Sequence, residues 1–279
     1  MAQLLERCPL CHAALDSKRQ GSAFSKCLSC DVMVRTPFPS DEELAELYRN
    51  SWRDPIENAR ETGGTNPSLA RIYSVKLARA LALRDFTGLK VLDFGAGRGA
   101  MLATLSELGA DVYGIDPFGA AALERRAFQA YRALSDLPRN LRFDGIVMID
   151  VIEHLSAPGV VLKQLRGILK DHGWIFIATP NVAGLAARLS WSNYREALKP
   201  GHLILFGPAG LEKLLEQSGF CSCRRLMWLV PYRRNPLRRL VHFGLQSTGM
   251  DGEARFIGFK REQAPQLDGP RRTRMRILP

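Results

Sequence analysis

Residues 89–100 constrain the fold of this 279-residue chain more than any other stretch. Their sequence is Leu-Lys-Val-Leu-Asp-Phe-Gly-Ala-Gly-Arg-Gly-Ala, a short apolar run followed by three spaced glycines. Residues 101–105 come next and have apolar side chains at helical spacing. A strand, a glycine turn and a helix N-terminus in this order predict a nucleotide-binding crevice. Glycine permits the tight turn, and the helix start offers free N–H groups.

Two kinds of nucleotide compete for this turn. Gly95, Gly97 and Ala100 fit the G-x-G-x-x-G/A dinucleotide pattern, and Asp116 follows about 20 residues later, as the ribose-binding acid of such sites does. Asp93 favours S-adenosylmethionine (SAM) instead, since its carboxylate would repel a pyrophosphate but attract an ammonium and a sulfonium. A turn without any ligand is disfavoured, because spaced glycines raise the entropic cost of folding. We therefore expect SAM.

The chain after the turn alternates strands with helices. We expect strands over 111–116, 131–134, 143–150 and 174–179, and helices over 118–129, 158–170 and 208–218. This alternation predicts an α/β fold with a doubly wound, mainly parallel, Rossmann-like sheet. Ligands of such sheets bind at the carboxyl ends of the strands. Five candidate side chains fall at those ends: Asp93, Asp116, Asp136, Asp150 and His154.

The N-terminal segment carries four cysteines in the pattern C-x₂-C-x₁₅-C-x₂-C: Cys8, Cys11, Cys27 and Cys30. This spacing is typical of a four-thiolate zinc site. So short a segment cannot build its own apolar core, so we expect the metal to fold it. Two disulfides are the alternative, but a reducing cytoplasm disfavours them. With four protein ligands the zinc would be structural and would not contact substrate.

The overall charge of +11 is unevenly distributed. Residues 224–279 hold 13 Lys or Arg and 4 Asp or Glu, so 13 − 4 = +9 of the charge lies there. Such a segment could contact nucleic acid, anionic lipid or a phosphorylated substrate, or form a solvated tail. The sequence has no apolar run long enough for a membrane span and no signal-peptide core, so we expect a cytoplasmic protein.

The region from about 86 to 222 resembles the class I SAM-dependent methyltransferases, in the small-molecule branch that includes the ubiquinone-biosynthesis O-methyltransferases. The motifs that carry this resemblance are Val91–Gly97, Gly114–Asp116, Asp144–Val147, Glu153–Leu155, Gly173–Ile177, His202–Leu203 and Phe206. The cysteine motif and Arg35–Ser40 are similar to a subset with an N-terminal zinc ribbon, whose members commonly methylate sugars, polysaccharide precursors or natural products.

The resemblance implies four segments: a zinc ribbon (1–39), a helical linker and lid (40–85), a SAM-binding methyltransferase domain (86–262) and a basic flexible tail (263–279). The domain should close with antiparallel strands over 224–228 and 254–260. The implied cofactor-binding set is Asp93, Gly95, Gly97, Gly99, Asp116, Asp136 and Asp150. In it, Asp93 and the glycines would hold the methionine end, Asp116 the ribose hydroxyls, and Asp136 the adenine.

Methyl transfer to a hydroxyl requires alignment of the nucleophile and removal of its proton. Histidine is the natural base near neutral pH, so we expect His154 and His202 at the acceptor cleft. Glu153 would orient His154 or cap a helix. Residues 191–200, which precede His202, should form a lid that faces the substrate.

These observations predict O-methylation of a small molecule or of a sugar or polysaccharide precursor. The alternative is an RNA methyltransferase whose zinc ribbon and basic C-terminal region contact phosphates. The Glu153–Leu155 motif favours the small-molecule branch, and the basic and aromatic residues are not interleaved as in base-stacking platforms. The sequence predicts no oligomeric state.

Overall fold

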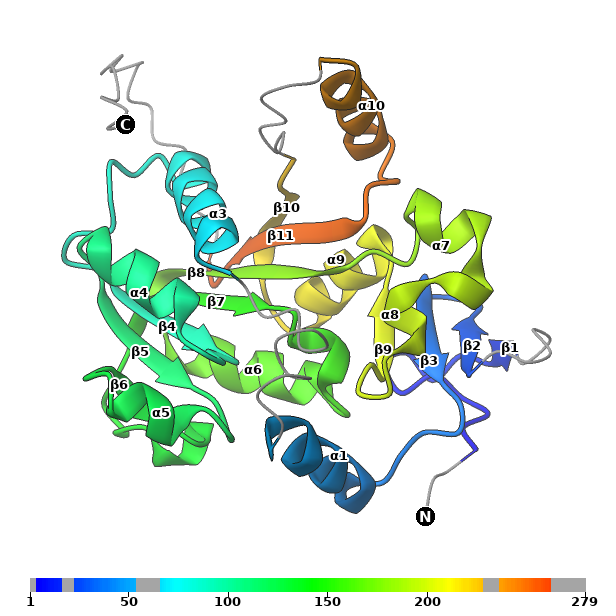
Figure 1. The fold of residues 1–279 in the computed structure, drawn as a ribbon, viewed down its shortest axis with the longest axis horizontal. Coiled ribbons are helices and arrows are strands. Elements are labelled where there is room, and N and C mark those ends of the chain that lie inside the picture. The colour runs from blue at the N-terminus through cyan, green and yellow to red at the C-terminus, as the bar shows by residue number, and fades with distance from the viewer. Residues whose placement is uncertain (1–3, 17–22, 54–65, 228–235, 262–279) are drawn as a thin grey trace.

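The structure, a computed structural model, describes residues 4–16, 23–53, 66–227 and 236–261 (Figure 1). Its larger sheet has seven strands in the order β10-β11-β8-β7-β4-β5-β6. The strands are β4 (Lys90–Phe94), β5 (Asp111–Ile115), β6 (Gln129–Tyr131), β7 (Phe143–Ile149), β8 (Leu169–Pro180), β10 (Cys221–Arg225) and β11 (Glu253–Phe259). Strands β6, β5, β4, β7 and β8 are parallel, whereas β11 runs antiparallel to both of its neighbours. The predicted mainly parallel, Rossmann-like sheet is therefore confirmed.

Helices cover both faces of this sheet, which explains its continuous apolar strands. The helices are α1 (Asp41–Arg53), α3 (Pro67–Ala80), α4 (Ala100–Glu107), α5 (Ala120–Glu124), α6 (Pro158–Ile168), α7 (Leu185–Leu189), α8 (Arg195–Leu198), α9 (Pro208–Gln217) and α10 (Pro236–Ser247), with short 3₁₀ turns η1 (Leu134–Asp136), η2 (Ile152–His154) and η3 (Trp191–Asn193). Val91 faces the core beneath α3 and α4, and its neighbour Leu92 faces the core beneath α6 and α9. This alternation gives a doubly wound architecture with two cores.

Several element boundaries differ from the prediction. The helix expected over 118–129 is shortened to α5, because Ala127 has a left-handed φ of 62° and Phe128 N–H turns back to Leu123 O at 3.1 Å. Strand β8 begins at Leu169, where a helix was expected, because Leu169 pairs with Phe143. Strand β10 ends at Arg225, before most of the strand expected over 224–228. The other closing strand, expected over 254–260, matches β11.

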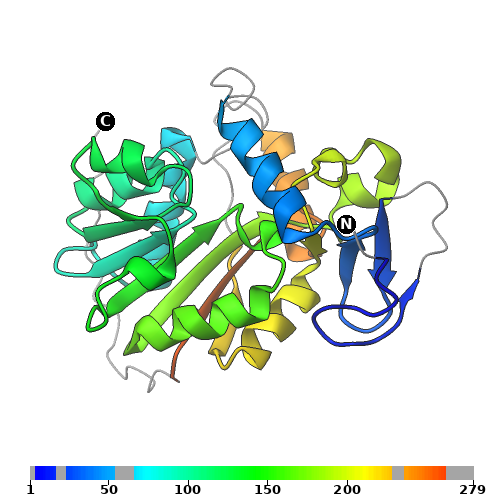
Figure 2. The ribbon, with the colours of Figure 1, turned by 90° about the horizontal axis from the view of Figure 1, so that it is seen from below.

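A second sheet joins the N-terminal segment to the rest of the chain. Its strands run in the order β1 (Leu15–Asp16), β2 (Phe24–Cys27), β3 (Val32–Arg35) and β9 (Ile204–Phe206). Strand β3 pairs antiparallel with β9, and Figures 1 and 2 show the two strands side by side. The cysteine segment and the segment 86–262 therefore share one sheet.

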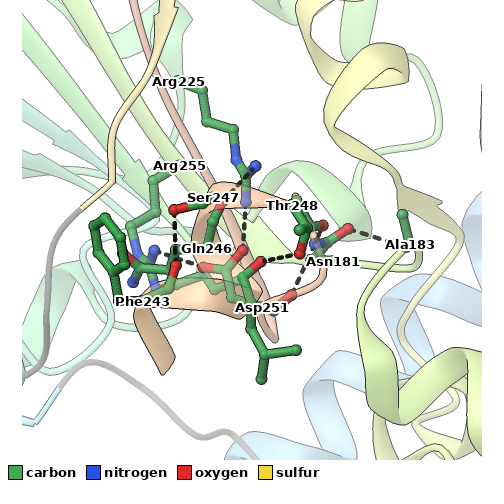
Figure 3. A network of polar contacts seen from close by, with 12 residues as sticks. Asn181, Ala183, Arg225, Phe243, Gln246, Ser247, Thr248, Asp251 and Arg255 are labelled. Atoms are coloured by element: carbon green, nitrogen blue, oxygen red, sulfur yellow. Dashed lines mark hydrogen bonds and ion pairs between the residues drawn. The ribbon is translucent and has the colours of Figure 1, made fainter. Parts of the chain in front are cut away.

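The turn between α10 and β11 is held by a buried ionic network (Figure 3). The Asp251 side chain is 1% exposed and pairs with both Arg225 and Arg255, the latter at 3.0 Å. The Asn181 amide donates to the backbone oxygens of Gly249 at 2.8 Å and of Asp251 at 2.7 Å. These contacts fix the start of β11 beside the end of β8.

Residues 54–65 of the predicted linker and lid, residues 228–235 of the predicted methyltransferase domain and the whole predicted tail lie outside the described residues. Helices α1 and α3 occupy the described part of the segment 40–85. A capping box opens α1, since Ser40 N–H donates to the Glu43 carboxylate at 2.8 Å and Glu43 N–H donates to the Ser40 hydroxyl at 3.3 Å. None of the described helices has the length and apolar content that crossing a membrane requires.

Candidate functional site

The four predicted zinc ligands converge at one point. The Sγ atoms of Cys27 and Cys30 lie 3.3 Å apart, and those of Cys8 and Cys30 lie 3.6 Å apart. A tetrahedral zinc with Zn–S bonds of about 2.3 Å would hold its sulfurs about 3.8 Å apart, so the cluster needs little adjustment to bind it. Burial and the neighbouring thiols raise the pKa of Cys30, a repulsion that a bound cation would relieve. The donor set fits zinc.

The glycine turn between β4 and α4 has the backbone that its sequence requires. Gly95, Gly97 and Gly99 have φ values of 83°, 52° and 78°, all in the left-handed region. A Cβ on Gly95 would lie 2.2 Å from Val151 Cγ2, whereas a Cβ on Gly97 would meet nothing closer than 4.0 Å. The turn therefore packs against Val151 on one side and leaves space at Gly97 for a ligand.

Two predicted carboxylates flank this turn. Asp93 is 4% exposed, and burial together with the Asp116 charge raises the pKa of Asp93 to about 7. Asp116 accepts N–H bonds from Gly97 at 2.9 Å, Phe118 at 2.9 Å and Gly119 at 2.6 Å. A carboxylate has about four acceptor positions, so Asp116 retains capacity for a ribose hydroxyl. A buried acid with a raised pKa suits a cationic ligand, as the methionine end of SAM is.

The other two predicted cofactor acids lie apart from each other. Asp136 is exposed in η1, where its carboxylate accepts the Ala133 N–H at 3.1 Å. Asp150 ends β7 with a left-handed φ of 52° and directly precedes Val151, which contacts the glycine turn. Burial and the nearby Glu253 carboxylate raise the pKa of Asp150 to about 7. Asp150 therefore lies beside the glycine turn.

The two predicted histidines form a pair in which His202 is buried and His154 is partly buried. Their rings are 4.7 Å apart and nearly perpendicular, at 86°. His154 Nδ1 lies 2.8 Å from Gly201 O, so Nδ1 carries the proton and Nε2 the lone pair. His202 Nδ1 lies 3.8 Å from the Glu196 carboxylate. Burial lowers the pKa of His154 to about 4 and that of His202 to about 2, so both rings are neutral at pH 7.

Glu153 lies beneath the histidine pair and is fully buried. One carboxylate oxygen accepts the Thr179 hydroxyl at 2.9 Å, and the other has no hydrogen-bond partner among the described residues. Burial and the Asp150 charge raise the pKa of Glu153 well above its usual range. Ligand atoms of Glu153, His154 and His202 lie within 4.8 Å of one another, a spacing at which they could also hold a metal ion.

A polar pocket of about 160 Å³ opens beside Asp150. Five of its seven lining residues are charged, and the full set is Asp150, Pro180, Arg195, Glu196, Lys199, Gly252 and Glu253. Lys199 Nζ contacts the Glu196 carboxylate at 2.6 Å. The predicted lid over 191–200 thus supplies three of the lining residues, and the turn held by Asp251 supplies two.

The sequence did not single out four residues that border this site: Arg35, Glu196, Lys199 and Glu253. Arg35 Nε donates to His202 O at 2.7 Å, and its Nη2 donates to Lys199 O at 2.6 Å. Glu253 accepts a hydrogen bond from the Tyr73 hydroxyl. The only signal for Arg35 is its place beside Thr36-Pro37, since its partners lie more than 160 residues away in the chain.

Comparison with known proteins agrees with this geometry. The sequence pattern of the methyltransferase domain family matches residues 68–221. The chain is 35% identical over 186 residues to a ubiquinone biosynthesis O-methyltransferase of Bradyrhizobium diazoefficiens, covering 58% of this chain and 68% of that protein. It is 32% identical over 157 residues to the same enzyme of Rhodopseudomonas palustris, covering 50% of this chain and 61% of that one. The chain thus matches about two thirds or less of the length of these relatives.

Two solved structures share the fold. One is the 1,6-didemethyltoxoflavin-N1-methyltransferase of Burkholderia thailandensis with bound S-adenosylhomocysteine, at a TM-score of 0.54 and 19% identity over 85% of this chain and 99% of that one. The other is a SAM-dependent methyltransferase of Archaeoglobus fulgidus, at a TM-score of 0.52 and 21% identity over 74% of this chain and 100% of that one. The extent of the family match decides the assignment: the chain belongs to the methyltransferase domain family and is a SAM-dependent methyltransferase.

Proposed function

We propose that this enzyme methylates a hydroxyl group of a small, polar acceptor, with the sugar of a glycan precursor as the favoured class. The observation that carries the proposal is the charged pocket lined by Asp150 and Glu196. Asp150 precedes Val151, which packs on the glycine turn, and the Glu196 carboxylate lies 3.8 Å from His202 Nδ1. Its acids and cations suit a ligand with many hydroxyls, since charge-assisted hydrogen bonds are the strong ones. A flat apolar ring would leave these groups without partners.

The proposed cofactor contacts follow the geometry of the turn. Asp93 and the backbone at Gly95, Gly97 and Gly99 would hold the methionine end, and Asp116 would accept ribose hydroxyls. Asp136 would border the adenine. Bound SAM would supply an activated methyl group on a sulfonium. The Asp93 carboxylate would neutralise the positive charge of the bound cofactor beside it.

The acceptor chemistry falls to the histidine pair and the pocket. The acceptor oxygen forms a bond to the methyl carbon as the carbon–sulfur bond breaks, and the hydroxyl proton must leave. His154 or His202 would accept that proton through the lone pair of its neutral ring, and the lowered pKa values make both rings weaker bases than a solvent-exposed imidazole. Glu153, which is fully buried beside the two rings, would help to position them rather than act as the base.

The RNA alternative gains little from the described part of the basic region. Arg225 and Arg255 pair with Asp251, and Lys260 donates to Leu169 O at 2.7 Å. These cations therefore serve internal contacts. The remaining basic side chains of residues 228–239 and 262–279 lie outside the description.

Acceptor screening tests the proposal directly. The protein would be incubated with SAM and separate panels of nucleotide sugars, catechols, small amines and RNA, and each product would be analysed by mass for one added methyl group. We expect methylation of a sugar hydroxyl. Methylation of RNA, or of an amine alone, would overturn the proposed acceptor class. Calorimetry with S-adenosylhomocysteine should show binding that Asp116→Ala largely removes.

A further inference from the structure

The zinc ribbon, residues 1–39, lies outside residues 68–221, which match the family. It nevertheless contacts the residues on both sides of β9, close to His202. Strand β3 pairs with β9 immediately after His202, with Val34 opposite Ile204. Two backbone bonds extend the pairing at both ends, from Arg35 N–H to Leu203 O at 2.8 Å and from Gly207 N–H to Asp31 O at 2.9 Å. The ribbon therefore fixes the backbone on which His202 sits.

Arg35 makes the most specific of these contacts. Its guanidinium donates to three backbone carbonyls within residues 197–202: His202 O (2.7 Å), Lys199 O (2.6 Å) and Ala197 O (3.4 Å). No carboxylate pairs with Arg35 among the described residues, and the guanidinium lies 4.6 Å from the centre of the Phe24 ring. The positive charge of Arg35 thus faces the carboxyl end of α8 and the turn after it, where backbone carbonyls have no partner within the helix.

The zinc knuckle itself contacts the segment that follows the carboxyl end of β9. Gly210 in α9 lies so close to the knuckle that a Cβ there would be 2.3 Å from Cys30 O. A Cβ on Gly207 would be 2.0 Å from the Asp31 carboxylate. Two glycines thus allow the metal-binding turn to pack directly against the segment that links β9 to α9.

We propose that the ribbon forms one wall of the acceptor site, with Arg35 as the positioning residue that holds residues 195–203 in place. Zinc would hold the turn between β2 and β3 through Cys27 and Cys30. Strand β3 pairs with β9, and Arg35 fixes the segment that carries Glu196, Lys199 and His202. Zinc occupancy then controls the acceptor side of the enzyme but not its SAM side. The inference rests on the proposed function, because it takes the 195–203 segment to be the acceptor wall.

Chemical labelling of histidine tests the proposal without a methyl acceptor. Diethyl pyrocarbonate modifies accessible imidazoles, and mass spectrometry locates each modified residue. His202 is 1% exposed and should stay unlabelled in the zinc-loaded protein, whereas the exposed His172 provides an internal control. The proteins compared are the zinc-loaded chain, the chelator-treated chain, and the variants Arg35→Gln, Arg35→Lys and Arg7→Gln.

We expect His202 labelling to rise about tenfold or more after zinc removal and in Arg35→Gln. Hydrogen bonds to a charged group contribute about 1.5–3 kcal/mol, and about 1.4 kcal/mol is tenfold. Arg35→Lys should restore part of the protection. Arg7→Gln should behave as wild type, because Arg7 donates only to His12 O within the ribbon, at 3.1 Å. Zinc content of the Arg35 variants and S-adenosylhomocysteine affinity of every protein should stay within about twofold of wild type.

Two results would overturn the inference. One is protection of His202 that persists both without zinc and in Arg35→Gln while His172 is labelled. The other is a loss of S-adenosylhomocysteine affinity that parallels the labelling, which would show that the ribbon stabilises the whole fold. Neither readout involves methyl transfer, so a wrong acceptor class leaves the test intact.

Discussion

At the scale of single residues, the pair of His154 and His202 carries the chemistry proposed for the acceptor side. His154→Ala and His202→Ala should each lower turnover by about 10²–10⁴, the usual effect of losing acid–base help. SAM affinity should change little, because neither ring contacts the glycine turn. Initial rates with an identified acceptor measure the effect, and exposed His172→Ala is the control. Near-normal turnover in both variants would indicate an acceptor that needs no base.

The raised pKa of Asp93 leads to a prediction about proton release when SAM binds. Its pKa of about 7 in the free protein should fall when a cation binds beside it, so SAM binding should release a proton. The affinity for SAM should therefore rise as the pH increases through about 7, because Asp93 is already ionised in the free protein at higher pH. Calorimetry in two buffers of different ionisation enthalpy measures the release. We expect less release with S-adenosylhomocysteine, which lacks the sulfonium, and none from Asp93→Asn. Equal release by Asp93→Asn would assign the proton to another group.

The sequence predicted residues of local motifs better than residues of distant contacts. Asp93, the three glycines and Asp116 belong to a strand, a turn and the next strand, so periodicity and spacing placed them. Arg35 acts through carbonyls of residues 197–202, and no pattern near Arg35 encodes that partnership. The raised pKa of Glu153 likewise depends on its burial and on the nearby Asp150 charge, which only the packed structure reveals.

At the scale of elements, the zinc ribbon should depend on its metal for folding. Cys8→Ser should bind zinc poorly and lose several kcal/mol of stability, because structural zinc binding contributes about 10–16 kcal/mol in small domains. Metal analysis and thermal unfolding measure both effects. Cys221→Ser is the matched control, since Cys221 lies in β10, away from the cluster. Full zinc occupancy in Cys8→Ser would exclude Cys8 as a ligand.

Strand β9 is an element that the sequence pattern did not predict. Residues 204–206 form a strand of only three residues, and its partner β3 lies in another part of the chain. The alternation of strands and helices identified the large sheet because each strand there is followed by its own crossover. A short strand that joins a separate sheet has no such signature.

At the scale of the whole molecule, the ionic network at Asp251 ties β11, α10 and β10 together (Figure 3). Asp251→Asn should lower the free energy of unfolding by about 3–5 kcal/mol, because it leaves the charge of buried Arg255 without one of its partners. Urea denaturation measures the loss. Asp171→Asn is the control, since Asp171 is 55% exposed and its pairs with Lys260 and Arg261 should contribute about 0–1 kcal/mol. Similar small losses in both variants would show that water screens the network.

The pairing of β3 with β9 also has a consequence for synthesis on the ribosome. Strand β3 is translated about 170 residues before β9, a delay of roughly 10–30 s at ordinary elongation rates. During that interval β3 is an unpaired sheet edge, and such edges are templates for pairing with other chains. A nascent chain that stalls before residue 204 would carry a ribbon that has its four cysteines but lacks its outer strand.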